Sequence, residues 1–189
     1  MVIFLALIAL VALTLGGLAL FRSADIGALV AGNMGMQRGA TRAGDVGTNA
    51  AIVWLNANGV AGSAVLHDDS AANGYSAAGV NDVPGTNQTW AEYWDVLTGS
   101  HPARNLAEDA VTGNQVSYVI QRLCDRVGPP YSASPLVRCV KPPYTDTAGG
   151  GQEAGDISLE SPTSVYYRVT SRIAGPRNSV SFIQALVVK

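Results

Sequence analysis

The sequence predicts an α+β fold in which a long N-terminal helix packs on a three- or four-stranded antiparallel sheet. Three observations carry this prediction. Residues 1–21 are apolar apart from Thr14 and carry no charge, apolar positions continue beyond them at helical spacing, and the C-terminal third holds alternating segments typical of strands. Packing a helix on one face of an antiparallel sheet buries an apolar surface of each, which is a stable layer arrangement.

The apolar run at the start of the chain is long enough to cross a bilayer. At about 1.5 Å of rise per residue it spans a hydrocarbon core of roughly 30 Å. No Lys or Arg precedes it, and the first charged residue is Arg22. Since a signal peptide begins with a basic segment, we expect Met1 to be a mature N-terminus from which a short basic leader was removed.

The helix is predicted to continue to about Asn56. Residues 23–56 contain no proline, and Asn58 and Gly59 supply a C-terminal capping signal. A helix of this length is about 85 Å long. We therefore divide the chain into a helical part, residues 1–57, whose residues 1–21 are hydrophobic, and a globular head, residues 58–189.

Small residues recur along this helix and suggest close packing. Each interior glycine costs about 1 kcal/mol relative to alanine, but small residues let helix backbones approach closely. We interpret them as a surface for contact with other helices; the alternative is a flexible, interrupted segment behind a membrane anchor. The adjacent glycines Gly16 and Gly17 are the expected place for the helix to stretch or melt. The remaining positions of this kind in residues 22–50 include Gly27, Gly32, Gly35, Gly39, Gly44 and Gly47.

Charge and cysteine content narrow the function classes. The net charge is −2 and no basic patch is visible, which argues against a nucleic-acid partner. Cys124 and Cys139 flank a loop rich in Pro and Ser. A redox or metal pair would call for a CxxC spacing or a nearby histidine, so we expect a structural disulfide formed in an oxidising compartment.

The middle of the chain is predicted to be a long loop followed by a short helix. Residues 60–88 are rich in Gly, Ala, Ser and Asn. Four residues in this segment offer oxygen ligands for calcium: Asp68, Asp69, Ser70 and Asn73. Their spacing fits no EF-hand, which favours a solvated loop. Thr89 and Glu92 then form a capping-box pattern. The helix face that follows is more typical of a core than of a sugar-binding platform. It consists of Trp90, Tyr93, Trp94 and Leu97.

Three strands are predicted in the remainder. Residues 116–123, 165–173 and 180–188 alternate or are rich in β-branched residues, and the last two are joined by a turn over residues 175–178 into an antiparallel hairpin. Residues 141–163, with prolines and Gly149–Gly151, form a turn-rich excursion and a candidate surface site.

Several of these segments together resemble the type IV pilin-like proteins, and among them the PilX-like minor pilins. One departure concerns Leu5, where most pilins carry a glutamate that pairs with the N-terminus of a neighbouring subunit, so that ion pair cannot form from this residue. The segments that carry the resemblance are residues 2–8, 13–23, 31–33, 118–124, 167–172 and 181–184.

The resemblance implies the pilin fold and a structural subunit of a type IV pilus-like extracellular filament. Its implied partners are copies of itself in a homopolymer, other pilins, the pilus assembly machinery and the inner membrane before assembly, with processing and methylation at Met1. Apolar burial and close packing would drive polymerisation. The expected assembly residues are Met1, Phe4, Leu5, Leu10, Gly16, Gly17, Gly27, Gly32, Gly35 and Gly39.

No enzymatic motif stands out. There is no P-loop, no GxGxxG after a strand and no HExxH, and His67 and His101 lie in separate loop-like segments. We therefore expect no catalytic residue, no cofactor and no metal; a tethered enzyme would need a cleft that unites His67 or His101 with an acidic residue. The alternative function is a membrane-tethered extracytoplasmic binding or adhesion domain that does not polymerise, with the cluster of Trp90, Tyr93 and Trp94 or residues 141–163 as its site.

Overall fold

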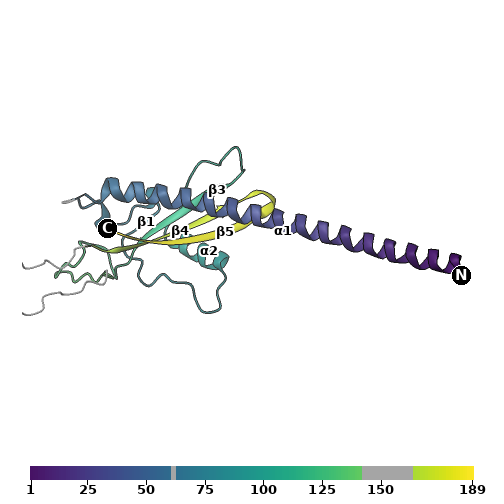
Figure 1. The fold of residues 1–189 in the computed structure, drawn as a ribbon. Helices are drawn as coiled ribbons and strands as arrows, with labels where there is room; N and C mark the ends of the chain where they lie inside the picture. Colours follow the sequence, from purple (N-terminus) through teal and green to yellow (C-terminus); the bar gives the residue numbers. More distant parts are fainter. Residues whose placement is uncertain (61–62, 142–163) are drawn as a thin grey trace, which may run out of the picture. The chain divides into compact units, whose positions relative to one another are not determined.

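The computed structural model describes residues 1–60, 63–141 and 164–189. Helix α1 (Val2–Asn58) runs unbroken, including through Gly16 and Gly17, where the sequence predicts a weak point. By internal packing the chain divides into two compact units, Met1–Thr41 and Arg42–Lys189. We call the second the globular unit; it contains the C-terminal part of α1 and every other element (Figure 1).

The sheet of the globular unit is mixed rather than wholly antiparallel as predicted. Strands β3 (Gln115–Arg122), β4 (Tyr166–Ala174) and β5 (Val180–Val188) form the antiparallel body predicted from the sequence. Two short strands, β1 (Tyr75–Ser76) and β2 (Arg104–Asn105), also pair with β3, and β1 does so in parallel. Strands of two residues are too short to show a period-2 pattern, which is why the sequence does not reveal them.

The register places two helices on opposite faces of this sheet. Tyr118 of β3 stands opposite Ser171 of β4, which in turn stands opposite Ile183 of β5. Ala51 and Leu55 of α1 pack with Tyr118 and its neighbours in one core cluster. The next residue along β3, Val119, points to the other face and joins the cluster of helix α2 (Trp90–Ser100).

Both faces of the sheet are thus covered within the globular unit. Arg168 and Thr170 of β4 lie on the sheet face that α2 covers, because side chains alternate between the two faces along a strand. Both are therefore buried although they are polar.

Helix α2 begins as predicted. The Thr89 hydroxyl accepts a hydrogen bond from the Glu92 backbone N–H, and the Glu92 carboxylate accepts from the backbone N–H and the hydroxyl of Thr89. These bonds, the backbone one first, lower the pKa of Glu92. Tyr93, Trp94 and Leu97 are buried, so most of the aromatic face is core, while Trp90 stays 44% exposed and stacks on Phe182.

Two buried arginines hold the irregular segments against the sheet. Arg122 is 0% exposed, and its guanidinium donates to the backbone carbonyls of Ala77, Leu66, Arg126 and Gly128. Arg168, on the other face, donates to Gln121 and to the carbonyls of Gly79 and Asp82. Together the two side chains bind carbonyls between residues 66 and 82, the stretch predicted to be a loop.

The expected disulfide is present. Cys124 and Cys139 are bonded, with 15 residues of sequence separation, and Cys124 is fully buried. Residues 142–163, most of the excursion singled out as a candidate surface site, lie outside the described residues.

Removing this crosslink is expected to destabilise the globular unit. Replacing both cysteines by alanine should lower the free energy of unfolding by about 3 kcal/mol, because the unfolded chain regains the freedom that the closed loop denies it. Urea unfolding of the full chain in detergent micelles, followed by tryptophan fluorescence, measures the loss. Wild-type protein kept in reductant is the control and should match the double variant; a crosslink without stabilising effect would give one midpoint for all samples.

Candidate functional site

The helix of the unit Met1–Thr41 has the most unusual surface in the described part of the chain. Its large apolar side chains are exposed, for example Phe4 at 73%, Leu5 at 66% and Leu10 at 64%. Apolar residues occur on every side of the helix over residues 2–21, so no single face accounts for them. Soluble monomers rarely expose apolar patches of more than a few hundred Å², so this surface calls for a cover of lipid or protein.

Helix α1 is also the one helix among the described residues that is long and apolar enough to cross a membrane. That criterion rests on length and composition, and signal sequences meet it as well. Of the assembly residues expected from the sequence, Met1 precedes α1 and all the others lie on α1 within residues 2–39. The disulfide lies in the globular unit, apart from that set along the chain.

The glycines of α1 fall into two groups by what surrounds them. A Cβ atom built on Gly47 would lie 2.7 Å from Val116 Cγ1 and 2.8 Å from Ser171 Oγ, and one on Gly44 would collide with Ile183. These two glycines therefore let α1 approach the sheet. The other six meet nothing within 4 Å among the described residues: Gly16, Gly17, Gly27, Gly32, Gly35 and Gly39.

This division corrects one point of the sequence analysis, which assigned Gly44 and Gly47 to the same helix-packing surface as the other glycines. They serve the globular unit itself. For the remaining six, no contact within the described chain explains the cost of glycine in a helix.

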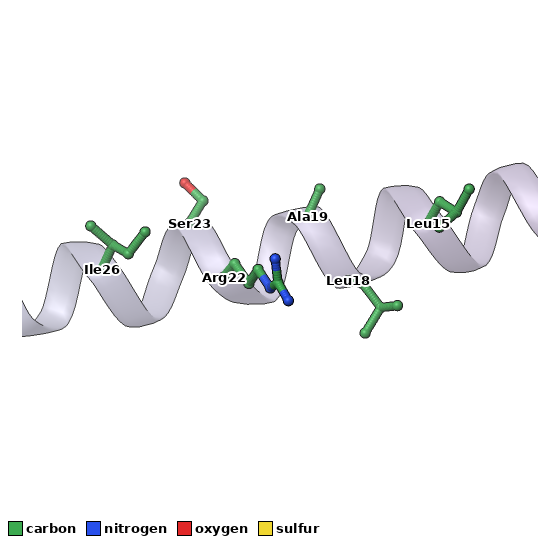
Figure 2. Close-up of a pocket in the computed structure, with 6 residues that line it drawn as sticks. All are labelled: Leu15, Leu18, Ala19, Arg22, Ser23 and Ile26. Atoms are coloured by element: carbon green, nitrogen blue, oxygen red, sulfur yellow. The ribbon is translucent and has the colours of Figure 1, made fainter.

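Charged side chains begin on the helix surface at Arg22. Figure 2 shows Arg22 and Ser23 on a face shared with Leu15, Leu18, Ala19 and Ile26. All six come from successive turns of one helix, so they line an open helix face and not an enclosed cleft. Arg22 and Asp25, one turn further on, are both exposed.

The globular unit contains one arrangement that the sequence does not reveal. His101 Nε2 lies 3.3 Å from Asp82 Oδ2, beside a cavity of about 180 Å³ between α2 and residues 81–88. Gln121 donates to the same carboxylate oxygen, and the Tyr93 hydroxyl donates to the Asp82 carbonyl. Burial raises the pKa of Tyr93.

This pair has two members of the arrangement that activates a nucleophile, but in the described part of the chain no hydroxyl or thiol hydrogen-bonds to His101. The side-chain carboxylate and backbone carbonyl of Asp82 instead connect residues 81–83 to α2 and to the sheet. The sequence does not identify the pair, because the two residues lie in different loops and no characteristic spacing marks them as partners.

Three of the four residues weighed as calcium ligands have other contacts. Asp69 accepts a hydrogen bond from the Ala77 backbone N–H, and Asn73 donates to the Ser70 hydroxyl. Among the described residues, no group of three or more His, Cys, Asp or Glu is placed to hold a metal ion.

The sequence matches no family model, and comparisons of the chain with curated proteins and with solved structures return no match.

Proposed function

We propose that this protein is a non-catalytic structural subunit of an extracellular filament of the type IV pilus kind, polymerising through the apolar helix of residues 1–41. One observation carries the proposal. The helix exposes an apolar surface on all sides together with six glycines that make no close contact within the described chain. Both features are accounted for if other helices cover this one.

Assembly in this proposal exchanges one apolar environment for another. Before assembly the helix lies in a membrane, for which its length and composition suffice. In the filament, neighbouring helices replace the lipid. Lipid tails are as apolar as leucine side chains, so the gain on leaving the membrane comes from close packing at the small residues rather than from burial alone.

The globular unit coats the filament in this proposal. A disulfide is typical of proteins that work outside the cytoplasm. The resemblance of the sequence to pilins supports the same location and adds the expected partners: copies of the chain, other pilins and the assembly machinery in the inner membrane. The alternative of a tethered binding domain finds less support, because Tyr93 and Trp94, two of the three aromatic residues expected to form its site, are buried in the core.

The proposal is tested in the cells that make the protein. Surface filaments are sheared off and the fraction is examined by intact mass spectrometry. The chain should be a major component, with a mass two hydrogens lower than the reduced form because of the Cys124–Cys139 bond. Detection in the membrane fraction alone would show a permanent anchor and would refute the filament.

A glycine variant tests the packing argument. Gly32→Leu places a bulky side chain where neighbouring backbones are proposed to meet, and should reduce the filament fraction by at least about tenfold. Gly99→Leu is the matched control, because Gly99 is also an exposed helical glycine with nothing within 4 Å, but lies in the globular unit. Equal filament yields from the two variants would show that Gly32 is not a packing contact.

A further inference from the structure

Two opposite charges, Arg22 and Asp25, lie three residues apart in the helix of the unit Met1–Thr41, and the next charged residue is Arg38. Arg22 is the first charged residue of the chain, and Asp25 is the only acidic residue in residues 1–41. Both are exposed, and among the described residues neither takes part in an ion pair. Their neighbours on the helix are apolar: Figure 2 shows Arg22 on the same face as Leu18 and Ile26.

The two charges are poorly placed to satisfy each other within one helix. They are three residues apart, with the basic residue before the acidic one, and this order is the weaker one for an intrahelical pair. In the structure they do not meet within the 4 Å that defines an ion pair. In water, hydration satisfies both groups, but between packed helices that hydration is lost and an unpaired charge becomes costly.

We infer that Arg22 of one chain pairs with Asp25 of a neighbouring copy, and that this pair sets the axial register of the helices in the assembly. The inference rests on the proposed function, since it needs helices of identical chains side by side. It commits to a second copy because residues 22–25 of each chain carry one charge of each sign, so this segment is complementary to the same segment of another copy. No other acid in residues 1–41 can serve Arg22.

The pairing fixes a direction of growth. In two parallel neighbouring helices, Arg22 of one lies at the height of Asp25 of the other when one helix is shifted along its axis by about 4.5 Å, the rise of three residues. The length of the arginine side chain allows a range of shifts around this value. Each chain then offers Arg22 to one neighbour and Asp25 to the next. Such a head-to-tail contact propagates through a helical filament instead of closing a dimer. It also gives the helix a specific ionic contact, which Leu5 cannot provide.

The test exchanges the two charges. Arg22→Asp and Asp25→Arg, each alone, should lower the sheared filament fraction at least about tenfold, because like charges then face each other between helices. The double exchange in one chain should restore filaments to near the wild-type level. Arg42→Glu, a reversal of charge on the same helix but in the globular unit, is the control and should assemble normally.

Co-expression of the two single variants separates pairing between chains from pairing within one. Mixed filaments should form, since each variant supplies the charge that the other needs. Rescue by the double exchange without rescue by the mixture would place the pair within one helix and overturn the inference.

The remaining outcomes are equally decisive. Single exchanges that assemble like the wild type, a double exchange that stays defective, or a defect of equal size in Arg42→Glu would each overturn the pairing while leaving the filament in place. Absence of the wild-type chain from sheared filaments would instead refute the proposed function itself. The disulfide, assayed in the membrane fraction of every variant, reports that the globular unit has folded.

Discussion

Arg122→Met is expected to lower the free energy of unfolding of the globular unit by about 4 kcal/mol or more. Hydrogen bonds to charged groups are among the stronger ones, and each buried carbonyl left unpaired carries a further penalty. Methionine fills part of the space of the arginine side chain but donates no hydrogen bond. Four carbonyls, contributed by three separate segments of the chain, would lose their donor together. A loss of this size approaches the whole stability of many domains.

The experiment compares two arginines of neighbouring strands. Arg172 on β4 is half-buried and its side chain makes no hydrogen bond among the described residues, so Arg172→Met should cost less than about 1 kcal/mol. Urea unfolding in detergent micelles, read by tryptophan fluorescence, gives both values. Arg122→Lys should fall between them, because a single ammonium group cannot reach carbonyls spread around a guanidinium fork. Equal midpoints for Arg122→Met and Arg172→Met would mean that the carbonyl contacts contribute nothing.

The second large effect is expected at Gly47. Gly47→Leu should destabilise the globular unit by about 3 kcal/mol, because overpacking forces the buried neighbours to move. The first of these neighbours is Val116, a branched side chain of β3, and the second is Ser171, whose hydroxyl is buried without a hydrogen-bond partner in the described chain. Because the two side chains belong to β3 and β4, displacing them disturbs the packing of α1 on the sheet.

Gly35→Leu is the matched control for this prediction. Both substitutions give α1 the same gain in helix propensity, but Gly35 has nothing within 4 Å. Thermal unfolding by circular dichroism should show a lower midpoint for Gly47→Leu and no loss for Gly35→Leu. A Gly47 variant as stable as the Gly35 variant would show that α1 can move away from the sheet at little cost.

Elements with a local signature were predictable from the sequence. The capping box of Thr89 and Glu92 fixes the start of α2, Gly59 follows the end of α1, and the alternation of residues 180–188 gives β5 with its observed bounds. In each case the residues that determine the element lie within one or two turns of each other. The disulfide was also predictable, because two cysteines allow only one pairing.

Elements that depend on contacts between distant residues were not predictable. The parallel strand β1 exists because Ile120 donates its backbone N–H to Gly74 and Tyr75 donates its hydroxyl to Leu66. Burial raises the pKa of Tyr75, so the hydroxyl stays a donor. The approach of His101 to Asp82 likewise follows from packing. Six of the α1 glycines have nothing within 4 Å in the described chain, so contacts within the described chain do not account for them.

The carbonyl contacts of Arg122 also bear on cooperativity. Residues 74–80 make several of their hydrogen bonds to β3 and to the residues that follow it: Gly79 donates to the Arg122 carbonyl, Val80 to the Cys124 carbonyl, and Gly74 accepts from Ile120. This stretch therefore loses several bonds at once when β3 leaves the sheet. Its opening free energy is tied to that of the strand, and β3 and the preceding connection behave as one unit in local unfolding.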